Sequence, residues 1–160
     1  MATVTKKGIA TETQIGGVPW GNMTILHFPL ETNSTGVWVD SDQATAIQVN
    51  DVLNLGILPA GLKIWDYIAN ISDAFTGSST GKIGFKYVDG VDSTAVPQDD
   101  DYFCAATSLA SQAKLRMTNV AVRPVTLPKP AYLTLTWAGA HADAVGKLDI
   151  GVIGVMTGQP

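Results

Sequence analysis

The sequence predicts an all-β fold: a jelly-roll-like β-sandwich of about eight strands with an extended N-terminal arm. Residues 82–87 and 132–137 alternate apolar and polar side chains most clearly. Such alternation places Ile83 and Phe85 on one face of a strand and Lys82 on the other. No helical pattern is long enough for a crossover between parallel strands, and turn-forming Gly, Pro and Asp residues separate the short runs. These three observations favour two packed sheets.

Composition indicates one domain with an unusually uncharged surface. A chain of 160 residues buries about 70% of its unfolded surface in a self-sufficient core. Only 15% of the residues are charged, against about 25% in typical soluble domains. Two interpretations stay open: part of the surface is covered in an assembly, or neutral Thr, Ser and Asn residues keep a solitary sandwich soluble.

Charge and hydropathy exclude several classes of partner. The net charge is −4, and residues 1–21 contribute +1 from two lysines and one glutamate, which leaves −5 for the rest. Without a basic stripe, no nucleic-acid partner is expected. No apolar run approaches the ~20 residues of a membrane helix, and no signal peptide is recognisable. Cys104 is the only cysteine, so neither an internal disulfide nor a cysteine-rich metal site is expected.

We divide the chain into an extended arm, residues 1–21, and one sandwich domain, residues 22–160. The arm has a single dense apolar point, Val18-Pro19-Trp20, with glycines on both sides. Such an arm is expected to dock through Trp20 against another surface. The alternatives are a disordered leader and an arm that lies on its own domain.

The first half of the domain contains five predicted strands, in ranges 23–28, 37–39, 45–58, 62–71 and 82–88. Pro29 is expected to end the first strand or to place it at a sheet edge. Polar residues interrupt the parity of the third, which predicts a bulge or bend, and Pro59-Ala60-Gly61 predicts a sharp turn.

The fourth strand has two apolar faces. Period-two alternation places Leu62, Ile64 and Ile68 on one side. It places Trp65, Tyr67 and Ile71 on the other. A central strand with a second covered face is therefore predicted, with Trp65 and Tyr67 as an oligomer or partner contact.

The second half begins with an acidic segment. Five aspartates and no Lys or Arg lie between Tyr87 and Ala113, and Asp99, Asp100 and Asp101 are expected in a solvated loop. A short helical turn is expected within residues 105–113. Further strands are predicted at residues 115–117, 120–126, 131–137 and 146–156.

Catalytic and metal-binding patterns are absent from the sequence. His27 and His141 have no partner at ligand spacing. The three consecutive aspartates lack the spaced carboxylates of a calcium loop, and no serine lies in a nucleophile elbow. No enzyme activity, metal or cofactor is expected.

The order of elements carries a family resemblance. It consists of a strand ending in Asn54-Leu55-Gly56-Ile57-Leu58-Pro59-Ala60-Gly61, the strand 62–71, a Thr/Ser/Gly turn into 82–88, and a terminal hairpin with 133–136 and 146–150. This order resembles the jelly-roll decoration, or cement, proteins of tailed bacteriophage heads, over residues 23–156. The arm has no counterpart in the pattern.

The resemblance implies a bacteriophage virion protein that binds the outer surface of the head and stabilises contacts between major capsid subunits. It would be made in the host bacterial cytoplasm, with the major capsid protein as its partner. Trp20 and Val18 would then anchor the arm on the capsid, and Lys6 and Lys7 would pair with acidic capsid residues. A phage fibre or tail adaptor is the alternative role.

A carbohydrate-binding module is a further alternative. Its candidate residues are the aromatics Trp38, Trp65, Trp137 and Tyr102, together with the acidic segment. Low charge and apolar strand faces also predict self-association as a symmetric dimer or trimer. The predicted inward-facing residues are Leu62, Ile64, Ile83, Phe85, Leu133, Leu135, Leu148 and Ile150.

Overall fold

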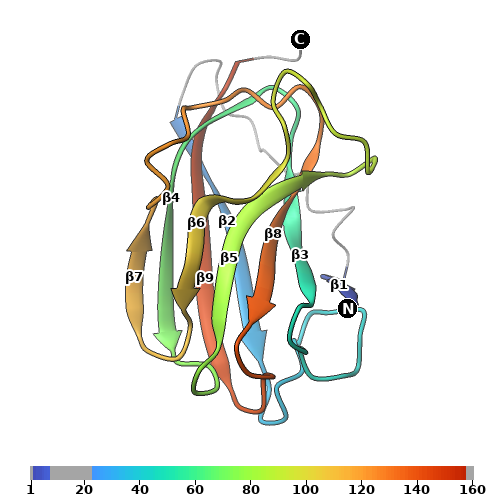
Figure 1. Cartoon of the computed structure of the whole chain (residues 1–160), viewed down its shortest axis with the longest axis vertical. Coiled ribbons are helices and arrows are strands. Elements are labelled where there is room, and N and C mark those ends of the chain that lie inside the picture. Colours follow the sequence, from blue (N-terminus) through green and yellow to red (C-terminus); the bar gives the residue numbers. More distant parts are fainter. Residues whose placement is uncertain (1, 8–22, 158–160) are drawn as a thin grey trace.

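The computed structural model describes residues 2–7 and 23–157, which form an all-β sandwich (Figure 1). The predicted arm anchors Val18 and Trp20 lie outside the described residues. The strands are β1 (Thr3–Thr5), β2 (Met23–Thr32), β3 (Val52–Leu58), β4 (Leu62–Asp73), β5 (Thr80–Tyr87), β6 (Asp99–Ser108), β7 (Ala113–Arg116), β8 (Ala131–Ala138) and β9 (Gly146–Met156). Within this part of the chain, no helix has the length and hydropathy needed to cross a bilayer.

The strands form two sheets, and the chain passes repeatedly from one sheet to the other. The first sheet has the order β1-β3-β8-β5-β6 and the second β2-β9-β4-β7. From β2 to β9, every connection except the β5–β6 hairpin passes from one sheet to the other. Apart from β1, this leaves two four-stranded sheets, so the predicted all-β sandwich is confirmed.

The core lies between the two sheets and contains every residue predicted to face inward. Leu62, Ile64, Ile83, Leu133, Leu135 and Ile150 are fully buried, and Phe85 and Leu148 are 1% exposed. An aromatic cluster extends from Phe85 through Tyr102 and Phe103 to Tyr67, with ring centroids 5.0–5.4 Å apart. Tilted and edge-to-face pairs of this kind add to the apolar burial.

A β-bulge in β4 overturns part of the predicted sidedness of that strand. The pairing with β9 shifts register between Ile64 and Asp66. The extra residue reverses the alternation, so Tyr67 is fully buried on the same side as Ile64. Ile68 points outward instead, at 37% exposure, whereas Trp65 points outward as predicted, at 48% exposure. Tyr67 is therefore a core residue and not a surface contact.

Two predicted strands are loops in the structure. Residues 37–39 form only isolated bridges, Thr32 with Trp38 and Val37 with Ala46. Residues 120–126 contribute a single bridge at Thr126, because Pro124 has no N–H to donate to a ladder.

Three further predictions change in detail. The strand predicted over residues 45–58 begins only at Val52, and its expected bulge lies between Asn54 and Gly56. Asp99–Asp101 open strand β6 and are not a loop, since this segment pairs with β5. No helical turn forms within residues 105–113, where β6 ends and β7 begins.

The first residues of the predicted arm belong to the sandwich. Strand β1 pairs in parallel with β3, at the lower right of Figure 1. The Ala2 N–H donates to Asp51 Oδ1 at 3.0 Å, and Val4 is 3% exposed in the core. The described start of the chain is therefore an edge strand of the first sheet.

Replacement of Phe85 tests the core. The Phe85→Ala substitution is expected to lower the free energy of unfolding by about 3–5 kcal/mol, because it leaves a cavity among packed rings. Denaturant titration measures the loss. The matched control is Lys82→Ala on the outer face of the same strand, which is expected to change stability by less than about 0.5 kcal/mol. A loss below about 1 kcal/mol for Phe85→Ala contradicts the assigned register.

Candidate interaction surfaces

The second sheet turns an apolar surface outward, which we call the apolar face. Its exposed members are Met23 and Ile25 on β2, at 67% and 57%, and Trp65 and Ile68 on β4. Half-buried side chains of β9 lie between them, namely Ile153 and Val155. Contiguous exposed apolar residues on a sheet mark an interaction site.

A groove crosses the middle of the apolar face at Gly151. The strand registers align His27, Gly151, Ile68 and Arg116 in one row across β2, β9, β4 and β7. A groove of about 750 Å³ lies along this row, and Ile25, Ile68 and Gly151 are among its lining residues. A Cβ atom at Gly151 would lie 3.0 Å from Ile25 Cγ2 and 3.2 Å from Ile68 Cγ1, so these two side chains already cover Gly151. The apolar walls of the groove thus pack closely over the backbone of β9.

Charged residues border the apolar face. His27 Nε2 lies 2.8 Å from Asp149 Oδ1, and Arg116 is paired with Asp66. The exposed Lys114 occupies the β7 end of the next row, which also contains Pro29, Asp149 and Asn70. The rim therefore carries both signs of charge.

The outer face of the first sheet is polar by contrast. On this face Thr136 of β8 is paired with Lys82 of β5, and Tyr132 is paired with Lys86. Lys82 Nζ is 3.3 Å from Asp100 Oδ2, and partial burial lowers the pKa of Lys86. The apolar surface is thus concentrated on one of the two sheets.

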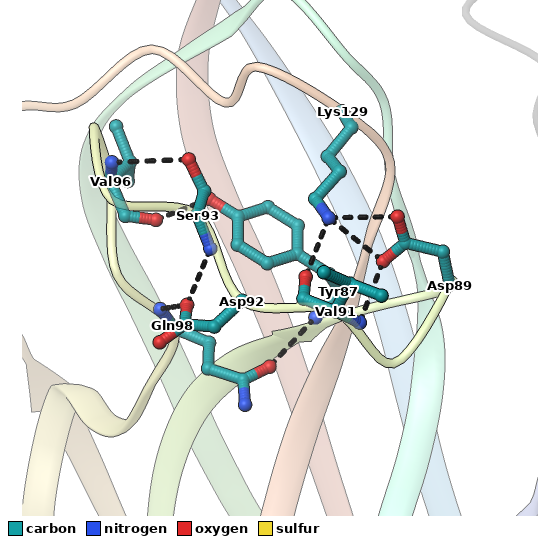
Figure 2. A network of polar contacts seen from close by, with 8 residues as sticks. All are labelled: Tyr87, Asp89, Val91, Asp92, Ser93, Val96, Gln98 and Lys129. Atoms are coloured by element: carbon teal, nitrogen blue, oxygen red, sulfur yellow. Dashed lines mark hydrogen bonds and ion pairs between the residues drawn. The ribbon is translucent and has the colours of Figure 1, made fainter.

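The β5–β6 loop projects from the end of the sandwich opposite the β8–β9 loop (Figure 1). Figure 2 shows Lys129 and Tyr87 at its centre. Lys129 Nζ donates to both oxygens of Asp89, at 2.9 and 2.7 Å, and to the Val91 carbonyl at 2.5 Å. The same ammonium group lies 4.6 Å from the centre of the Tyr87 ring. These contacts tie the loop to the chain just before β8.

The other half of the loop is organised by Asp92. Its Oδ1 accepts hydrogen bonds from the N–H groups of Ser93 and Gln98, both at 2.7 Å. The Tyr87 hydroxyl donates to the Val96 carbonyl at 2.5 Å (Figure 2). The loop presents Val91, which is 62% exposed. Val91 is therefore an exposed apolar residue on a loop that polar contacts hold in place.

The acidic residues at the start of β6 form a cluster. The carboxylates of Asp99, Asp100 and Asp101 have ligand oxygens within 4.8 Å of one another. A hydrogen bond with Asp99, followed by partial desolvation and the neighbouring negative charges, raises the pKa of Asp101. The cluster is partly exposed and lies next to Lys82, which is typical of solvated carboxylates on a protein surface.

The predicted site residues are not brought together. Lys6 is only 8% exposed, and its backbone bridges to Ser41, so its side chain is largely covered. The next residue, Lys7, is exposed at the end of this first described segment. Of the proposed partner contacts, Trp65 is exposed and belongs to the apolar face, whereas Tyr67 is buried.

The candidate sugar-binding aromatics are mostly core residues. Trp137 is fully buried, and Trp38 and Tyr102 are 1% and 4% exposed. Burial raises the pKa of Tyr102 to about 12. Among these four aromatics, only Trp65 is accessible to a ligand.

The remaining reactive groups have structural contacts. His141 Nδ1 lies 3.2 Å from the Val49 N–H. Cys104 is a buried free thiol, and the Thr118 hydroxyl lies 3.7 Å from its sulfur.

Comparison with known proteins shows a fold shared with phage capsid chains. No protein-family model matches the sequence, and no curated protein matches it. A chain of the capsid of Ralstonia phage GP4 matches with a TM-score of 0.66 and 15% identity, over 99% of both chains. A chain of the cyanophage Pam1 capsid asymmetric unit matches with a TM-score of 0.57 and 14% identity, over 90% of this chain and 91% of that chain. At such identities the likeness concerns the fold.

Sequence reasoning missed the groove and most of the apolar face. The sequence signal was present in β2, where Met23 and Ile25 alternate with Leu26 and Phe28, so that both faces are apolar. Gly151 lies in an apolar strand and gives no sign that it is flanked by two isoleucines from other strands.

Removal of the Asp92 carboxylate tests the order of the β5–β6 loop. In Asp92→Ala, the Gln98 N–H loses its acceptor, so its amide hydrogen exchange is expected to accelerate by about tenfold. Exchange followed by NMR measures the change. The control is Asp100→Ala, outside the loop, which is expected to leave Gln98 exchange unchanged. Equal exchange in Asp92→Ala and the unmodified protein contradicts the role given to Asp92.

Proposed function

We propose that this chain is a bacteriophage virion structural protein: a capsid decoration protein that binds the outer surface of the head and stabilises contacts between major capsid subunits. The observation that carries the proposal is the likeness to a chain of the Ralstonia phage GP4 capsid, which extends over 99% of both chains. At 15% identity this is a likeness of fold, and it extends over the whole sandwich. The role is one of binding and not of catalysis.

The surface of the protein supports attachment to a larger assembly. A free solitary protein gains nothing from a contiguous apolar face, whereas an assembly subunit buries it. The pre-ordered loop around Val91 is a further contact, because a loop that is already rigid loses little entropy on binding. Both features fit a protein whose chemistry is confined to its surfaces.

Shell attachment is proposed to use the segment that joins β1 to β2. Trp20 is the anchor, with Val18 beside it, because buried aromatics dominate many interfaces. Lys7 is exposed and contributes charge. Lys6 is removed from the proposal as a charge contact, since it is largely covered by the sandwich itself.

The carbohydrate-binding alternative loses most of its support. It required several accessible aromatics, and three of the four candidates, Trp38, Trp137 and Tyr102, are buried. The alternative role, a fibre or tail adaptor with this fold, differs from that of a decoration protein in what the protein binds. Binding to shells built from the major capsid protein alone discriminates the two roles.

Co-sedimentation tests the proposed function. The purified chain, mixed with undecorated shells of the major capsid protein, is expected to migrate with the shells, at a saturable stoichiometry. Trp20→Ala is expected to reduce the affinity at least about tenfold, as for an interface aromatic. Deletion of residues 1–21 is a poorer test, because it also removes strand β1.

The comparison variant for Trp20→Ala is Trp65→Ala, which removes the same side chain from the apolar face. A larger loss of shell binding in Trp65→Ala than in Trp20→Ala places the main attachment on that face. Denaturant titration checks that both variants fold. If Trp20→Ala binds shells with unchanged affinity, the arm is not the attachment. If the unmodified protein stays at the top of the gradient in the presence of shells, the decoration role is wrong.

A further inference from the structure

Strand β2 is an edge strand of the second sheet, with β9 as its neighbour among the described strands. Thr32 bridges to Trp38 on the side of β2 opposite β9, and there the Glu31 carbonyl accepts a hydrogen bond from the Val39 N–H at 2.9 Å. The register between β2 and β9 has no shift, so the backbone groups of every second residue share the direction of the Glu31 carbonyl. The outer edge of β2 therefore presents the backbone groups of the alternate residues from 23 to 29.

The first half of β2 is incompletely covered. No described strand or bridge pairs with its outer edge. Met23 and Ile25 are 67% and 57% exposed on the outer face of the sheet. On the inner face Leu26 is only half-buried, whereas Phe28 and Leu30 further along the strand are buried in the core. This stretch is thus open along its edge and partly open on both faces.

The other three edges of the two described sheets have features that discourage pairing. β7 has four residues, including Lys114 and Arg116. β1 has three residues, and the Asp42 N–H donates to its Thr5 carbonyl. β6 has two register shifts and begins with three aspartates. Short strands, charges and bulges protect the edges of natural sheets. Residues 23–27 of β2 contain no register shift and no Lys, Arg, Asp or Glu, so this edge is available to another strand.

We infer that β2 pairs with β2 of a second copy of this chain, antiparallel and around a two-fold axis that passes through the sheet at Ile25. Ile25 then pairs with the second copy's Ile25, and Met23 pairs with the second copy's His27. Each of these pairs exchanges two backbone hydrogen bonds. The second sheets of the two copies become one continuous sheet. The inference does not depend on the proposed function.

The backbone of β2 supports the position of this axis. Pro29 has no N–H, and the Glu31 carbonyl is already bound, so the ladder cannot continue through these two residues. An axis at Ile25 leaves both residues outside the paired stretch in each copy. Every outward N–H of residues 23, 25 and 27 then has a carbonyl of the second copy as its acceptor. The open stretch is therefore complementary to itself, as a symmetric contact requires.

The side chains support a second copy as the occupant of the edge. A two-fold axis perpendicular to the sheet keeps outer face with outer face, so the apolar faces of the two copies join at Met23 and Ile25. On the inner face, Thr24 lies opposite the second copy's Leu26, whose half-buried side chain gains cover. No like charges lie opposite each other in the paired stretch, and such a repulsion would destabilise the ladder. The contact is small, so association is expected at micromolar concentrations.

Sedimentation equilibrium of the full chain tests the inference. Over about 1–200 µM, roughly the range in which a small interface associates, the mass is expected to rise from 16.8 kDa toward twice that value. Ile25→Pro is expected to weaken association at least about 30-fold, because it removes the central N–H donor of each copy. That N–H points away from β9, as the nitrogen of Pro29 does, so the ladder between β2 and β9 is retained.

The matched control is Ile25→Ala, which removes the same side chain and keeps the N–H. It is expected to weaken association by less than about fivefold, since only a cross-strand side-chain pair is lost. Denaturant titration at low concentration checks that both variants fold. A monomer at every concentration, a trimer, or equal weakening by Ile25→Pro and Ile25→Ala overturns the inference.

NMR of the unmodified protein tests the register. In a mixed sample in which half of the chains carry carbon and nitrogen isotope labels, an intermolecular NOE is expected between the Hα protons of Thr24 and Leu26. These residues form a pair without mutual hydrogen bonds, whose Cα atoms lie about 4.5 Å apart. A dimer without this NOE overturns the proposed axis. Protection of the Ile25 amide from exchange only on capsid shells overturns the inference too, because the edge then pairs with a strand of the shell.

Discussion

The pairing of β4 with β9 is the interaction on which the rest of the structure depends. The bulge between Ile64 and Asp66 lies in this pairing and reverses the alternation of β4. Upstream of it Ile64 faces the core, and downstream of it Tyr67 does. Without the bulge, Tyr67 would point to solvent and Ile68 into the core. One inserted residue thus determines both the packing between the sheets and the outward position of Ile68.

The structure shows where the uncharged part of the surface lies. The first sheet turns threonines, lysines and an aspartate outward, and the second sheet turns isoleucines, a methionine and a tryptophan outward. Large exposed apolar residues are therefore concentrated on one of the two faces, where charged residues border them. In a jelly-roll-like sandwich each sheet has only one outer face, so one face can bind a partner while the other remains solvated.

The core was predictable from the sequence because period-two alternation is directly readable in β5, β8 and β9. Phe85 and Leu133 are buried as their patterns require. Long-range geometry was not predictable. The reversal in β4 arises from an extra residue that cannot be recognised in the apolar pattern. The close packing over Gly151 involves Ile25 and Ile68, which belong to two other strands. The loop around Asp92 depends on Lys129, 40 residues from its partner Asp89. Such contacts are set by topology and not by local spacing.

Cryo-electron microscopy of major-capsid shells incubated with the purified chain tests the central claim most directly, since it reveals whether and where the protein binds. The account predicts added density of the size and two-layered shape of this sandwich on the outer surface of the head, located over contacts between capsid subunits. A reconstruction identical to that of the undecorated shell, at protein concentrations well above those that saturate specific interfaces, would contradict it.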